Sequence, residues 1–145
     1  MMQKKLIALA LVAAAGTSLA QATPVGLWKT IADDGKTEKS LVRIAESGGA
    51  VNGRVEKILD PAKAASLCEE CSDERKGQPV TGMTIIRSVK KGDDGVWAGG
   101  DILDPNNGKV YKVRLKPVDG GKKLEVRGYL GTPMLGRTQT WIRVE

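Results

Sequence analysis

The feature that most constrains the fold is a regular alternation of short strand-like segments with glycine-rich turns. In "VYKVRLK", Tyr111, Val113 and Leu115 share one face, and basic side chains occupy the other. "LVRI" and "KLEVRGYL" repeat this period of two. Turn motifs separate such segments: "DDGK" at 33–36, "ESGG" at 46–49, "KGDDG" at 91–95, "DPNNG" at 104–108 and "DGG" at 119–121. We therefore predict eight strands, at residues 25–30, 40–45, 51–58, 83–89, 96–103, 110–116, 124–130 and 138–144.

Eight strands joined by short hairpins predict an all-β, up-and-down antiparallel meander. The alternation indicates that one face is buried. Closing the sheet into an eight-stranded barrel buries that face and removes the exposed sheet edges. One connection differs, an insertion at about 61–78, in which "AKAASLCEE" predicts about two helical turns followed by loop. We expect this insertion to form a lid over one barrel mouth.

The N-terminus has the pattern of a secretory signal peptide, residues 1–22. Lys4 and Lys5 precede an apolar run from Leu6 to Ala15, and small residues offer cleavage after Ala20 or Ala22. An uncleaved anchor is the alternative. No later segment reaches the roughly 20 apolar residues that a membrane-spanning helix needs. We predict one domain at 23–145, exported to the periplasm or secreted, from a Gram-negative bacterium.

Charge and composition argue against several functions. Without the two signal-peptide lysines, the mature chain keeps 21 of the 23 basic residues against 17 acidic ones, and the signs are interleaved. This pattern does not predict a nucleic-acid surface. The chain has no histidine, which removes the commonest general base. We find no cofactor motif and no assembled catalytic constellation, so the sequence favours a non-catalytic protein.

Trp28 is one of three tryptophans in a chain without phenylalanine, and it follows Gly26 at the start of the first strand. We predict that it plugs one barrel end. Because the first and last strands of such a barrel pair, an arginine of the last strand, Arg137 or Arg143, is expected over the indole face. We assign the plug to Trp28 and Arg143. Gly-x-Trp is also the motif that opens the lipocalins and their wider relatives.

Longer motifs carry a more specific resemblance. They are "TPVGLWKT", "KILDPA", "CEEC" with a later glycine, "GMTII", "W-x-GGDILDPNNGKVYK" and "LEVRGYLGTPMLGRTQTWIRV". In this order they cover almost the whole mature chain, which resembles a bacterial family of exported proteins, domain of unknown function number 2147. The resemblance implies a lipocalin-like barrel and an exported location, and it brings no established activity.

Cys68 and Cys71 form "CEEC", which has three interpretations. A thioredoxin-like redox motif would need a βαβ context that is missing here, and a zinc site would need further cysteines or histidines. A local disulfide in an oxidising compartment is the interpretation we favour. We predict no metal site.

"ILDP" occurs twice and places Asp60 and Asp104 at strand exits. Two carboxylates at one barrel end can perform acid–base chemistry or bind a hard cation. The turn interpretation is favoured, with Asp capping a turn and Pro fixing φ.

"RGYLGTPMLGR" offers apolar and cationic side chains between the last two strands. We predict that Arg127, Tyr129, Met134 and Arg137 form the rim of a ligand site, with the arginines able to meet an anionic headgroup. In the alternative, Met134 and Leu135 fold back to cover a barrel end.

The sequence thus favours a carrier of one small apolar or amphipathic ligand, such as a lipid, which needs a barrel interior that is not filled. The alternatives are an envelope scaffold with a filled barrel, and a hydrolase or isomerase using Asp60 and Asp104. The sequence makes no prediction of the ligand's identity or of the oligomeric state. The predicted interior ligand contacts are Val42, Ile44, Val55, Ile85, Val113, Leu115 and Val126.

Overall fold

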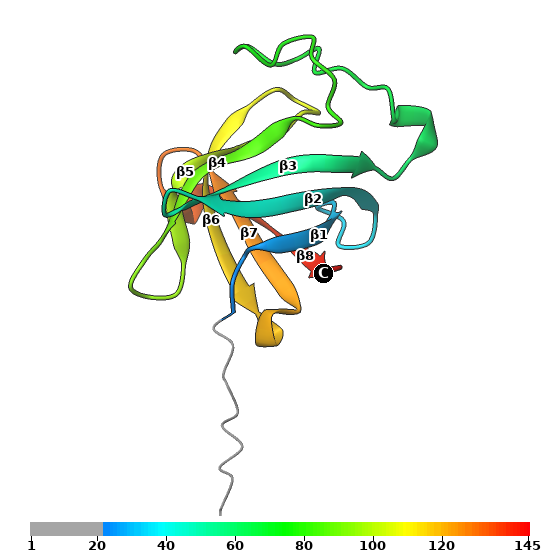
Figure 1. Ribbon diagram of the computed structural model, residues 1–145. Coiled ribbons are helices and arrows are strands. Elements are labelled where there is room, and N and C mark those ends of the chain that lie inside the picture. Colours follow the sequence, from blue (N-terminus) through cyan, green and yellow to red (C-terminus); the bar gives the residue numbers. More distant parts are fainter. Residues whose placement is uncertain (1–21) are drawn as a thin grey trace, which may run out of the picture.

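Eight antiparallel strands, each hydrogen-bonded to the next, close into a barrel in which β8 returns to β1 (Figure 1). The computed structural model describes residues 22–145. The predicted fold class is confirmed, and the predicted segments differ from the strands only at their ends. The predicted signal peptide lies outside the described residues but for Ala22. The strands are β1 Gly26–Ile31, β2 Glu38–Ser47, β3 Ala50–Ile58, β4 Thr84–Lys91, β5 Trp97–Leu103, β6 Val110–Val118, β7 Lys123–Tyr129 and β8 Arg137–Arg143.

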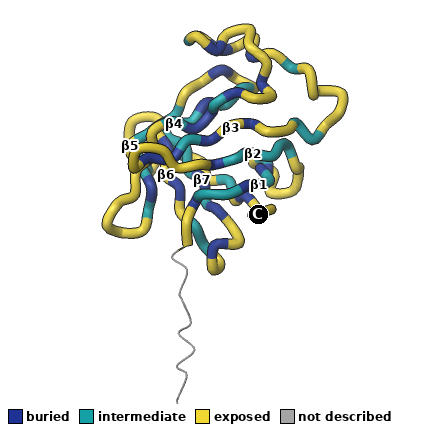
Figure 2. The backbone as a smooth tube through the Cα atoms, viewed as in Figure 1, coloured by how far each residue is buried: buried dark blue, intermediate teal, exposed yellow. Residues whose placement is uncertain are grey.

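The alternation of apolar and polar residues along the strands places apolar side chains inside the barrel and polar side chains outside it. On β6, Val113 and Leu115 are buried, whereas Lys112 and Arg114 are exposed. In Figure 2, which colours the chain by burial, dark blue buried residues and yellow exposed residues follow one another along the strands. One connected core results, because inward side chains from all eight strands meet along the barrel axis.

The connection from β3 to β4 is the longest excursion from the barrel (green, upper right in Figure 1). The predicted two turns of helix are wrong, since only a 3₁₀ turn forms, at Pro61–Lys63. The backbone N–H of Cys68 instead donates to the carbonyl oxygen of Gln78, and the N–H of Gly77 donates to the carbonyl oxygen of Cys68, both at 2.8 Å. These cross-loop bonds compete with helical bonds and overrule the local helix propensity.

Trp28 closes one end of the barrel. Its side chain is fully buried, and its Nε1–H donates to the carbonyl oxygen of Pro24 at 2.7 Å. The guanidinium of Arg143 lies 4.2 Å from the centroid of the indole ring. Arg143 also donates to the carbonyl oxygens of Thr23, Val25 and Gly121. This arginine therefore ties the segment before β1, the end of β8 and the β6–β7 turn to the buried indole.

Gly26 allows the guanidinium of Arg143 to lie close to the start of β1. Its φ of +145° suits glycine, and a Cβ at this position would overlap Nη1 of Arg143.

Candidate functional site

A cavity of about 780 Å³ opens at the end opposite Trp28. The connections β1–β2, β3–β4 and β5–β6 and the first residue of β8 contribute to its rim. The volume is within the roughly 300–1,000 Å³ typical of small-molecule sites. Its apolar wall includes Ile31, Val55, Ile58, Leu67, Val80, Ile85, Ile102, Leu103, Val126 and Trp141.

The predicted interior contacts divide into two groups. Val55, Ile85 and Val126 line the cavity. Val42, Ile44, Val113 and Leu115 do not line it, and they are almost completely buried in the core. The register gives the reason for two of them, because Val42 lies opposite Trp28 and Ile44 lies opposite Gly26, at the plugged end.

Arg137 lies at the mouth of the cavity between two carboxylates. Its guanidinium is 3.0 Å from an oxygen of Asp33 and 2.7 Å from an oxygen of Asp104. It also lies 5.5 Å from the ring centroid of Tyr111. Partial burial lowers the pKa of Arg137, but the hydrogen bond to Asp104 and the nearby negative charges outweigh it and raise the pKa above its ordinary value. The sequence predicts that Arg137 binds the anionic group of a ligand, but Arg137 instead binds two carboxylates of the protein itself.

Two further polar side chains extend this network into the cavity. The side-chain amide of Gln139 donates to Asp33 at 2.8 Å, and Trp141 Nε1 donates to Gln139 at 3.0 Å. Sequence reasoning missed Asp33, Gln139 and Trp141 as cavity residues. The alternation of "RTQTW", which places residues 137, 139 and 141 on one strand face, is the signal that points to two of them.

Asp60 and Asp104 both line the cavity, and both cap turns. Asp60 Oδ1 accepts from the backbone N–H of Ala62 at 3.0 Å. Asp104 Oδ1 accepts from the backbone N–H of Asn106 at 2.9 Å, while its other oxygen binds Arg137. These are the contacts of the favoured turn interpretation.

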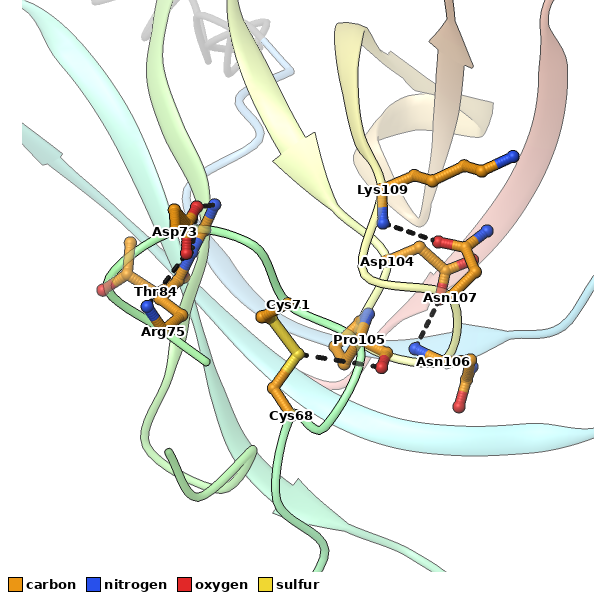
Figure 3. The surroundings of a disulfide bond; sticks show 10 residues. All are labelled: Cys68, Cys71, Asp73, Arg75, Thr84, Asp104, Pro105, Asn106, Asn107 and Lys109. Carbon is orange, nitrogen blue, oxygen red and sulfur yellow. Dashed lines mark hydrogen bonds and ion pairs between the residues drawn. A yellow bond between two sulfur atoms is a disulfide. The ribbon is translucent and has the colours of Figure 1, made fainter. Parts of the chain in front are cut away.

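A disulfide joins Cys68 to Cys71 and lies beside the β5–β6 turn (Figure 3). Both cysteines are buried, and Sγ of Cys68 lies 3.8 Å from the carbonyl oxygen of Pro105. Gly108 has a φ of +70°, and a Cβ there would overlap the carbonyl oxygen of Glu70. The "CEEC" loop and the "DPNNG" turn therefore pack backbone against backbone and form one side of the cavity mouth, which Glu69, Glu70, Pro105 and Asn106 line.

Comparison with known proteins places the chain in a family. The family model described as "Uncharacterized protein conserved in bacteria (DUF2147)" matches residues 26–143. The chain belongs to the DUF2147 family. The resemblance inferred from the sequence motifs is thus confirmed, and the matched range contains all eight strands.

The fold of this DUF2147 chain is similar to that of a solved structure, protein HP1028 from the human pathogen Helicobacter pylori, described as belonging to the lipocalin family. The TM-score is 0.74 at 21% sequence identity, and the match covers 86% of this chain and 84% of the other. At this identity the likeness concerns the fold. The comparison with curated proteins gives no match.

A buried arginine anchors the disulfide loop of the DUF2147 barrel to β4. Arg75 is only 5% exposed, and its Nη1 donates to the carbonyl oxygen of Thr84 at 2.9 Å (Figure 3). Its Nη2 lies 2.6 Å from a carboxylate oxygen of Asp73. This hydrogen bond, with that from the backbone N–H of Arg75, lowers the pKa of Asp73 from 3.8 to about 2.

The stabilisation from the ion pair between Asp73 and Arg75 is expected to depend on pH. Because the pKa of this carboxylate is lowered by folding, the stabilisation is complete above about pH 4 and is lost as the pH falls through about 2. An NMR titration of the Asp73 carboxyl carbon is expected to have its midpoint near 2. In Arg75→Gln the midpoint should move toward 3.8. A wild-type midpoint near 3.8 would contradict the assignment.

The residues at the β7–β8 loop that were predicted to form the rim lie outside the cavity. Arg127, Tyr129 and Met134 do not line the cavity. Arg127 donates to the carbonyl oxygen of Pro133 and to the hydroxyl of Thr138, both at 2.8 Å. Met134 and Leu135 are 89% and 79% exposed, so the alternative in which they fold back over the barrel end is wrong.

Within residues 22–145, no three side chains of His, Cys, Asp or Glu gather in a group that could hold a metal ion. No helix in this part of the chain has the length and apolar character needed to cross a membrane.

Proposed function

We propose that this chain is an exported carrier that binds one small amphipathic molecule, such as a single-chain lipid, in the open cavity. The observation that carries the proposal is the composition of this cavity, which combines a wall of aliphatic side chains and Trp141 with a polar network at one side of its mouth. Such a wall suits an apolar chain, and convergent polar groups orient a headgroup. The lipocalin description of the structural neighbour supports a binding role.

The charges around the cavity support one kind of headgroup for the proposed ligand. Its lining includes three basic side chains, Lys39, Lys63 and Arg137, and the charge of Arg137 is held by Asp33 and Asp104. The acidic lining residues number six: Asp33, Glu38, Asp60, Glu69, Glu70 and Asp104. An excess of acids disfavours an anionic headgroup, because each like charge costs electrostatic energy. We therefore propose an uncharged or cationic headgroup, in place of the anionic one that the sequence predicts.

Export is the second part of the proposal. The N-terminal pattern with Lys4, Lys5 and the apolar run Leu6–Ala15 supports cleavage and translocation. The Cys68–Cys71 disulfide supports an oxidising compartment such as the periplasm.

Displacement of a neutral fluorescent probe, N-phenyl-1-naphthylamine, tests binding. We expect saturable binding of one probe per chain, with dodecylamine and dodecanol displacing it better than dodecanoate. Val126→Trp places a large ring in the cavity and should weaken binding at least about tenfold. Val144→Trp, at a half-exposed site outside the cavity, is the matched control and should bind as the wild type does. Equal binding by both variants would contradict a site in this cavity.

A further inference from the structure

The β7–β8 loop presents a fixed apolar tip to solvent. The tip consists of Leu130, Met134 and Leu135, which are 54%, 89% and 79% exposed. A 3₁₀ turn, Pro133–Leu135, shapes it, and Arg127 holds its base through the carbonyl oxygen of Pro133. Gly136 packs so closely on Gly128 that an added Cβ would lie 2.6 Å from the Gly128 carbonyl oxygen. The loop is thus held at its base in a position that leaves its apolar side chains in water.

A basic wall adjoins this tip on the outer face of β6 and β7. The wall consists of Lys112, Arg114, Lys116, Lys123 and Arg127. The register places Arg114 opposite Arg127 and Lys112 opposite Tyr129, one residue before the tip begins. β6, β7 and β8 contain a single acidic residue, Glu125. None of the five basic residues takes part in a salt bridge within residues 22–145, although the register places Lys116 opposite Glu125 and Lys112 opposite Asp101 of β5.

Apolar side chains that project beside a group of cations without salt bridges are the surface chemistry of a protein that lies on an anionic membrane. Apolar groups enter the boundary between headgroups and acyl chains, and Lys and Arg bind the anionic headgroups. We propose that the basic wall and the apolar tip together dock on the surface of an anionic phospholipid bilayer. This inference goes beyond the proposed carrier function and does not depend on it.

The cavity sets the orientation of this docking. The acids that line its mouth would be repelled by anionic headgroups, which disfavours an approach with the mouth facing the bilayer. Docking on the side wall keeps those acids away from the lipid. Because the tip joins β7 to β8 and Arg137 of β8 lines the mouth, the mouth then lies close to the membrane surface.

Co-sedimentation of the mature chain with vesicles tests the proposal. We expect binding to phosphatidylcholine vesicles that contain about one third phosphatidylglycerol, weaker binding in about 0.5 M NaCl, and no binding to pure phosphatidylcholine. Lys112→Gln/Arg114→Gln/Lys116→Gln should weaken binding on the order of 100-fold, at about fivefold per charge. Met134→Ser/Leu135→Ser should weaken it about tenfold or more, because two apolar side chains no longer enter the lipid.

Matched variants exclude trivial causes. Lys57→Gln/Lys90→Gln removes exposed charges from β3 and β4, and Val144→Ser removes an exposed apolar side chain far from the tip. Both should bind as the wild type does, and circular dichroism should show that every variant folds. Wild-type protein that does not sediment with anionic vesicles, or tip and wall variants that bind like these controls, would overturn the proposal. Probe binding in the cavity is measured without vesicles, so failure of one proposal is distinguishable from failure of the other.

Discussion

Trp28→Ala is expected to lower the free energy of unfolding by about 3–5 kcal/mol, the range found when a buried aromatic side chain is truncated. The indole of Trp28 is fully buried, donates a hydrogen bond to Pro24 and lies under the guanidinium of Arg143. Its removal opens a cavity at the plugged end. It also leaves the Pro24 carbonyl oxygen and the guanidinium without their aromatic partner. A marginally stable domain would lose a large part of its stability.

Urea denaturation followed by circular dichroism measures this loss. Trp28→Phe keeps a ring under Arg143 and should lose less than Trp28→Ala. Met134→Ala, at a side chain that is 89% exposed, should change the stability by less than about 0.5 kcal/mol. A loss below about 1 kcal/mol for Trp28→Ala would show that this end of the barrel does not depend on the plug.

Gly108→Ala is expected to have the second large effect, because it separates the disulfide loop from the β5–β6 turn. Its positive φ costs an L-residue roughly 1 kcal/mol or more. The new Cβ would in addition overlap a backbone oxygen, that of Glu70, which cannot rotate away as a side chain would. We expect a total loss of about 2–4 kcal/mol. Weaker probe binding should accompany it, since Glu69 and Glu70 belong to the cavity lining.

Gly35→Ala separates the cost of the positive φ from the cost of the overlap with the Glu70 carbonyl oxygen. Gly35 has nearly the same φ, +71°, and nothing lies within 4 Å of an added Cβ. The difference in unfolding free energy between the two variants therefore reports the packing of the "CEEC" loop on the "DPNNG" turn. Equal losses in the two variants would mean that this packing contributes nothing.

The strands and the barrel were predictable because they depend on local patterns. A period of two in apolar residues and glycine-rich turns at hairpin spacing define the strands wherever one sheet face is buried. The contact between Trp28 and Arg143 was predictable for a topological reason, since the closed meander pairs β1 with β8.

The site was predictable only in part. Period two identifies which side chains point inward, but it does not say which of them pack around the plug and which face the cavity. Val42 and Val55 differ in this respect although both are buried. The polar network depends on pairs that are remote in sequence, such as Asp33 with Gln139, and no local pattern encodes them. The helix predicted after Asp60 failed for the same reason, because Cys68 bonds to Gln78 across the loop.

Native and denaturing mass spectrometry, on protein purified from the periplasm without delipidation, tests whether the barrel carries a ligand. We propose that this exported barrel, plugged by Trp28, carries one amphipathic molecule in the cavity at its other end. We expect a processed chain, about 2 Da light because of the Cys68–Cys71 bridge. We also expect one extra small mass per chain, lost on denaturation and absent from Val126→Trp. A wild-type chain that carries no extra mass, or an extra mass that Val126→Trp retains, would contradict the proposed function.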